Sequence, residues 1–171
     1  ADLAELGDAP VTAELLEKHF KSNEGRNISW GVTSLFAVTD DDAELKDYMA
    51  RVITAYARLI LAARDMQKGD LTGGTGLVLN KRFNVWKQNS FDLGVGWTMG
   101  GAGMAVSYDV LYNDMTEKQR TTVRAAIAAG IKDRMSYGMN EPRGKAISNH
   151  YGYHGDLAVL CAAIEGEEGF D

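Results

Sequence analysis

A long run of helical periodicity, opened by three acidic residues, constrains the fold of this chain most strongly. Asp40, Asp41 and Asp42 match the positive end that a helix presents at its first turn. From Ala43 to about Gln67, apolar side chains then recur every three or four residues. They are Tyr48, Met49, Val52, Ile53, Tyr56, Leu59, Ile60 and Ala63. A stripe this wide predicts a long helix that packs on more than one neighbour.

Other segments repeat the helical pattern. Residues 11–20 predict a helix with Thr12 as its N-cap. A further helix is predicted after Gly101, and it is followed by a tight turn at residues 113–115. The next helix begins with a capping box formed by Thr116 and Gln119 and ends by Gly138. Their expected apolar faces hold Met104, Tyr108, Leu111 and Tyr112 in the first, and Val123, Ile127, Ile131 and Met135 in the second. The last helix is predicted over residues 157–165.

Residues 68–98 break the helical pattern with six glycines and four large aromatic side chains. A loop of this length within a compact domain is more often functional than idle. We therefore expect residues 1–171 to form a single all-α domain of antiparallel helical hairpins, with 68–98 as a long Gly- and aromatic-rich loop.

Composition excludes several classes of protein. The net charge of −6 argues against nucleic acid as a partner, because phosphate binding needs a basic field. The apolar runs are short and interrupted, so no membrane span is expected. Cys161 is the only cysteine and lies on the apolar side of the last predicted helix, which predicts a buried, unreactive thiol.

The richest group of functional side chains precedes that last helix. Asn149, His150, Tyr151, Tyr153 and His154 stand within six residues, and Arg143 and Lys145 come shortly before them. Amide, imidazole, phenol and cationic groups together suit the neutralisation of a carboxylate and the movement of a proton at the adjacent carbon. The simpler alternative is that Asn149 caps the helix and His150 is a core histidine.

Neither a metal nor a nucleotide cofactor is expected. The His150 and His154 pair has metal-ligand spacing but lacks the glutamate of a zinc-protease motif. Gly73-Gly74-Thr75-Gly76 lacks the ending of a phosphate-binding loop.

Two tryptophans of the long loop are candidates for sugar binding. Trp86 and Trp97 can stack on pyranose rings, and Lys81, Arg82 and Lys87 would offer charge to an acidic glycan. The alternative is that these tryptophans pack against the core and hold the loop in place.

Residues 105–120 read AVSYDVLYNDMTEKQR. This run, with Ser148-Asn149-His150 after it, resembles the helical hairpin and the Asn-His step of polysaccharide lyases that have an α/α-toroid domain, the heparinase II/III-like and related alginate lyases. The resemblance covers about residues 99 to 165 and implies that the chain forms part of an incomplete (α/α) toroid.

The resemblance implies β-elimination on a uronic-acid-containing glycan such as alginate or a glycosaminoglycan, without a cofactor. Asn149 and His150 would be catalytic, and Trp86, Trp97, Arg143, Tyr153 and His154 would bind substrate. The tyrosine acid and a C-terminal β-rich domain, which the family places later in the chain, are expected outside these residues. We therefore expect a piece of a larger, secreted or periplasmic enzyme whose partners are an acidic polysaccharide and the remainder of its own polypeptide.

Two other classes stay open at this point. A toroid glycoside hydrolase would need two carboxylates across a cleft, and Asp92, Asp109 and Asp156 are available. A non-catalytic helical domain for glycan or protein binding would need neither carboxylates nor a base.

Overall fold

The computed structural model describes residues 3–12, 14–16, 25–39, 42–69, 100–140, 150–167 and 169–170. Within helices, it describes residues 25–30, 63–64, 66–69, 100–102, 133–140 and 150–156 by their backbone only. Across these ranges the chain is all-α and contains no strand, as the sequence predicts.

A short 3₁₀ turn, η1 (Leu3–Glu5), comes first, and the helices follow in two hairpins and a further helix. The first hairpin pairs α2 (Gly25–Val38) with α3 (Ala43–Gly69). The second pairs α5 (Gly100–Leu111) with α6 (Glu117–Asn140) through the 3₁₀ turn η2 (Tyr112–Asp114). The last helix is α7 (His150–Ile164), which returns along α6.

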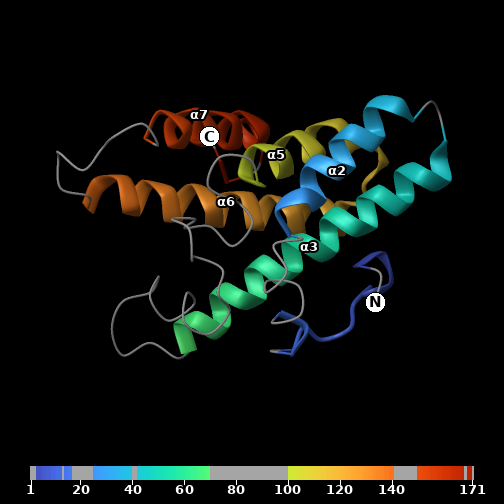
Figure 1. Cartoon of the computed structure of the whole chain (residues 1–171), viewed down its shortest axis with the longest axis horizontal. Helices are drawn as coiled ribbons and strands as arrows, with labels where there is room; N and C mark the ends of the chain where they lie inside the picture. Colours follow the sequence, from blue (N-terminus) through green and yellow to red (C-terminus); the bar gives the residue numbers. More distant parts are fainter. Residues whose placement is uncertain are drawn as a thin grey trace.

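In chain order, the described helices alternate between two layers (Figure 1). One layer holds α2, α5 and α7, and α5 contacts both of its neighbours there. The other layer holds α3 and α6, which lie in contact. Each helix of the first layer packs on a helix of the second layer that is its neighbour in the chain: α2 on α3, α5 on α6, and α7 on α6.

The core lies between the two layers. Its largest fully buried side chains are Leu16, Met49, Ile53, Tyr56, Leu59, Ile60, Met104, Tyr108 and Leu111. Burial of each such side chain contributes about 1.5–3 kcal/mol relative to exposure. The predicted stripe of α3 supplies most of this core, which confirms that α3 packs on several neighbours at once.

Local hydrogen bonds explain where the helices begin. The Asp42 carboxylate accepts from the Leu45 backbone N–H at 3.0 Å, which caps α3. The Thr12 hydroxyl accepts from the Leu15 N–H at 3.3 Å, as predicted. The predicted capping box is also present, because Gln119 N–H donates to the Thr116 hydroxyl at 3.3 Å and Thr116 N–H donates to Gln119 Oε1 at 2.8 Å.

The first layer is joined by small and polar side chains. Ser107 of α5 is fully buried, and its hydroxyl lies 3.0 Å from that of Thr33 in α2. Gly103 and Ala105 on the same helix are also buried. Because small side chains shorten the distance between helix axes, α5 can approach α2, α6 and α7 closely.

The structure adds one helix and corrects two sequence-based expectations. Helix α2 was not expected from its sequence, and α7 begins at His150 rather than at Leu157. Cys161 is exposed, so the prediction of a buried thiol was wrong. Leu160 and Ile164, one helical turn apart, face the core, and Cys161 is rotated from Leu160 by about 100° around the helix.

Candidate functional site

The residues predicted to bind and cleave a glycan are described only in part. Asn149, Arg143, Trp86 and Trp97 lie outside the described residues. His150 is the first residue of α7, and Tyr153 and His154 belong to the same helix, of which the backbone alone is described there. By helical register, positions 150, 153 and 154 share one side of α7.

The start of α7 lies at one end of the helix array. Because α7 runs antiparallel to α6, its first turn is found toward the C-terminal end of that long helix (Figure 1). The first turn of a helix carries unpaired N–H groups and a partial positive charge, and both favour an anion. Asn149, which lies outside the described residues, precedes His150 directly in the sequence.

The run of residues 105–120 has a structural role, because its side chains stabilise the corner between α5 and α6. Arg120 donates to the backbone carbonyls of Tyr112 and Met115, both at 3.1 Å. Its guanidinium also lies 4.9 Å from the centre of the Tyr112 ring. Met115 is buried at the corner. The resemblance on this run therefore concerns the shape of the hairpin and not the chemistry of a site.

A buried polar cluster joins α5, α6 and the turn after α7. Glu167 accepts from the Tyr108 hydroxyl at 2.9 Å and from Arg124 Nη1 at 2.6 Å. The side chains of Arg124 and Glu167 are only 15% and 16% exposed, so this ion pair is largely removed from water. The Tyr108 ring meets that of Tyr112 edge-on, with centroids 5.5 Å apart.

The protonation of this cluster follows from its surroundings. Burial raises the pKa of Tyr108, and the hydrogen bond to Glu167 and the charge of that carboxylate raise it further. Burial alone would raise the pKa of Glu167, but hydrogen bonds from Tyr108, Arg124 and Tyr112 and the charge of Arg124 lower it overall. The cluster therefore holds a neutral phenol and an ionised carboxylate that lock three elements together.

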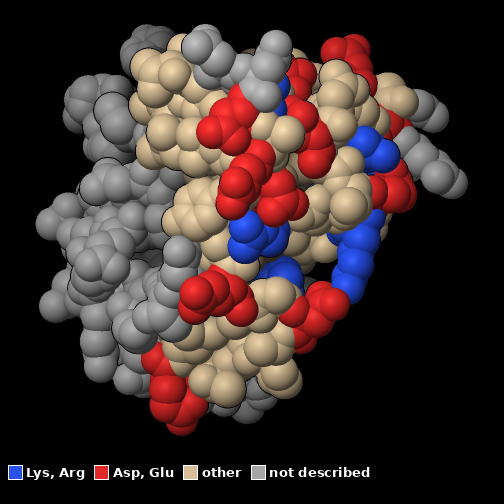
Figure 2. All heavy atoms as spheres, turned by 90° about the vertical axis from the view of Figure 1, so that its right-hand side faces the viewer, with Lys and Arg blue, Asp and Glu red and all other residues tan. Residues whose placement is uncertain are grey.

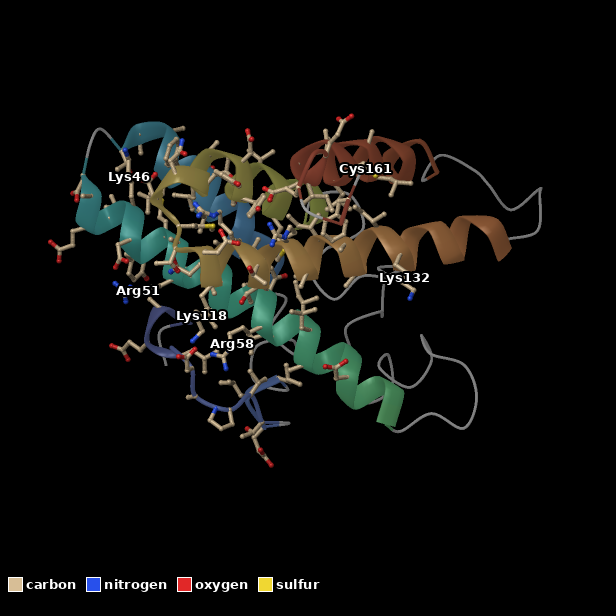
Figure 3. All side chains as sticks on the ribbon, turned by 180° about the vertical axis from the view of Figure 1, so that it is seen from behind. Lys46, Arg51, Arg58, Lys118, Lys132 and Cys161 are labelled. Carbon is tan, nitrogen blue, oxygen red and sulfur yellow. The ribbon has the colours of Figure 1, made fainter. Side chains whose placement is uncertain are left out.

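A second polar feature is a hollow between the N-terminal segment, α3 and α6, with a volume of about 220 Å³. Arg51 and Arg58 from α3 and Lys118 from α6 line it, together with Asp8. Figure 3 shows the three basic side chains gathered beside the N-terminal segment. On the face in Figure 2, basic side chains form small clusters bordered by acidic ones. No sequence pattern predicted this hollow. The one local signal for it is that Arg51 and Arg58 are two helical turns apart on one face of α3.

No group of three or more His, Cys, Asp or Glu side chains in the described ranges is placed to hold a metal ion. None of the described helices is long and apolar enough to span a membrane.

The fold and these features define an all-α protein of layered helical hairpins. No protein-family model, no curated protein and no solved structure matches the chain.

Proposed function

We propose that this chain belongs to a polysaccharide lyase that cleaves a uronic-acid-containing glycan, such as alginate or a glycosaminoglycan, by β-elimination. The observation that carries the proposal is the start of α7 at His150, directly after Asn149. The first turn of a helix favours a substrate carboxylate electrostatically, and the proposal assigns the amide of Asn149 and the imidazole of His150 to it.

The arrangement of the helices also supports the proposal. Alternation between two layers is what an (α/α) toroid requires of consecutive helical hairpins, and α2, α3, α5, α6 and α7 alternate in this way. The run of residues 105–120, on which the resemblance to the lyases rests, forms the corner of one hairpin. An acidic polysaccharide as substrate and a secreted or periplasmic location belong to the same proposal.

The reaction needs a stabilised enolate. A base removes the proton at C5, the C4–O bond breaks, and a C4–C5 double bond forms in conjugation with the carboxylate, while the departing oxygen takes up a proton. The C5 proton is too weakly acidic for a side chain to remove unaided. In the proposal Asn149 donates to the carboxylate, and His150 neutralises it or acts as the base. Each such donor contributes on the order of 3–4 kcal/mol to the transition state.

The activity is tested by ultraviolet absorbance during incubation of the natural protein with alginate, heparin, chondroitin and ulvan. Elimination creates a conjugated double bond and raises the absorbance, whereas hydrolysis does not. Binding of a glycan without new absorbance would contradict the proposal and favour a non-catalytic domain.

Substitution of Asn149 separates its proposed role from helix capping. Asn149→Asp keeps a good N-cap but replaces the amide donor by a carboxylate, which repels the substrate. We expect turnover to fall about 100-fold or more while the melting temperature stays the same. The matched control is Asn113→Asp, which adds the same charge at an exposed position in η2. Equal turnover of the two variants would remove Asn149 from the site.

A further inference from the structure

The hollow beside the N-terminal segment is distinct from the start of α7. Lys118 and Thr122, which line it, belong to the first two turns of α6, whereas α7 begins toward the far end of that helix. A helix of 24 residues is about 36 Å long. Any ligand of the hollow is therefore separate from a substrate held at Asn149 and His150.

The two arginines are held in place by the backbone of the N-terminal segment. Arg58 donates through Nη1 to the Gly7 carbonyl and through Nη2 to the Ala9 carbonyl, the latter at 2.6 Å. Arg51 donates through Nη1 to the Ala4 carbonyl at 3.3 Å and through Nε to Asp47 at 2.8 Å. Neutral carbonyls leave the positive charge of Arg58 uncompensated at these two contacts, and they fix the plane of its guanidinium group.

Lys118 completes the basic wall from the other helix. Its Nζ lies 2.7 and 2.6 Å from the two carboxylate oxygens of Asp8. Three basic side chains and one acidic side chain thus line the hollow. Asp8 pairs with Lys118 and Asp47 pairs with Arg51, which leaves the positive charge of Arg58 in excess. The charge is local, because the whole chain carries −6.

Two hydroxyl groups that line the hollow are arranged to accept hydrogen bonds. Thr54 donates its proton to the Ala50 carbonyl at 2.7 Å, and Thr122 donates its proton to the Lys118 carbonyl at 2.9 Å. Since both hydroxyl protons are used within the helices, the two oxygens are left as acceptors. The fixed guanidinium of Arg58 beside hydroxyl acceptors matches a ligand that carries both a carboxylate and hydroxyl groups.

The volume limits the size of that ligand. Pockets for drug-sized molecules enclose about 300–1,000 Å³, and this hollow of about 220 Å³ is smaller. It accommodates one sugar-sized ring rather than several.

We propose that the hollow formed by Arg51, Arg58, Lys118 and Asp8 binds a single sugar-acid unit, with its carboxylate toward the basic side chains and its hydroxyls toward Thr54 and Thr122. The unit can be a free uronic acid or one residue of a longer acidic glycan. Binding would also hold the N-terminal segment against α3 and α6, because this segment forms one wall of the hollow. The proposal does not depend on the lyase activity.

Calorimetric titration of the natural protein with sodium glucuronate tests the proposal, with glucose as the uncharged control. We expect a dissociation constant of about 1 mM for glucuronate and no measurable binding of glucose. A short glucuronate-containing oligosaccharide separates the two sources: tighter binding than the free acid indicates a glycan residue, and weaker binding indicates the free acid. No heat from either acid at concentrations about tenfold higher would overturn the proposal.

Variants that change the charge of the hollow should change its affinity for glucuronate in opposite directions, which a purely structural role of these residues would not produce. Asp8→Asn removes the acidic group and should tighten glucuronate binding about fivefold, whereas Lys118→Gln should weaken it by a similar factor. Lys132→Gln, an equal change of charge at an exposed position of α6 that does not line the hollow, is the matched control and should leave binding unchanged. Equal weakening by Lys118→Gln and Lys132→Gln would show only a general attraction of charge and refute a site. Slower amide exchange in residues 3–12 on addition of glucuronate is the independent expected readout.

Discussion

Replacement of Glu167 by Gln tests whether the buried cluster holds the end of α7 to the second hairpin. The carboxylate accepts from Tyr108 at 2.9 Å and from Arg124 at 2.6 Å. Glutamine preserves the shape and one acceptor, so the hydrogen bond from Tyr108 can persist. The change removes the negative charge that pairs with Arg124.

The cost follows from the burial of the pair. Removing one partner of a fully buried ion pair costs about 3–5 kcal/mol, because the other charge is left uncompensated. Arg124 and Glu167 retain 15% and 16% exposure, and Glu117 still lies 3.7 Å from Arg124. We therefore expect a loss of about 2 kcal/mol in the free energy of unfolding. For a chain of this length, that loss lowers the melting temperature by about 4–8 °C.

Thermal and urea unfolding of Glu167→Gln measure this loss. Glu165→Gln is the matched control, because Glu165 is exposed in the same turn, and it should change stability by less than about 0.5 kcal/mol. A double-mutant cycle with Arg124→Gln should give a coupling of about 1–2 kcal/mol. Equal stability of the two glutamine variants, or no coupling to Arg124, would refute this account of the cluster.

Two further predictions concern protonation and capping. Because the folded-state pKa of Glu167 lies below its ordinary value of 4.5, its contribution to stability is present above that value and is lost as the pH falls through the folded pKa. The raised pKa of Tyr108 acts in the alkaline range, since its contribution is present below the ordinary value of 10.0 and is lost as the pH rises through the folded pKa. Melting temperatures across pH should show both losses, and an acid limb that is unchanged in Glu167→Gln would contradict the assignment to Glu167. Thr116→Ala removes the capping box of α6 and should lower the free energy of unfolding in urea by about 1 kcal/mol. Thr121→Ala, on the exposed face of the same helix, is the control and should cause a smaller loss. Equal losses in the two variants would argue against the cap.

Much of the fold could be predicted because its signals are local. The stripe of α3 and the faces of α5 and α6 follow from helical spacing, and the caps at Asp42 and Thr116 follow from residues within one turn. These signals need no knowledge of which helices meet. They therefore predicted the all-α class and the second hairpin correctly.

The two helices that were missed or shortened have weak local signals. Helix α2 contains Gly25, Gly31, Ser and Thr residues, all of which lower helix propensity, and it is held by packing on α3 and α5. The first turns of α7 contain Gly152 and Gly155, which favoured a later start than His150. In both cases tertiary contacts outweigh intrinsic propensity.

The polar features found in the structure depend on contacts between distant residues. Tyr108 and Glu167 are 59 residues apart, and Lys118 and Asp8 are 110 apart. No periodicity relates such pairs, because only the layering of the helices brings them together. The group around Asn149 and His150 was noticed because it is contiguous in sequence, and both its arrangement in space and its catalytic role stay predictions.

The most direct test of the proposed lyase activity is the mass of the oligosaccharides released from a uronic-acid-containing glycan. Elimination yields one new end that lacks the elements of a water molecule, and this unsaturated end should appear in wild-type digests and disappear with Asn149→Asp. Fragments that have all gained a full water molecule, or an intact polymer after prolonged incubation with each glycan, would contradict the account.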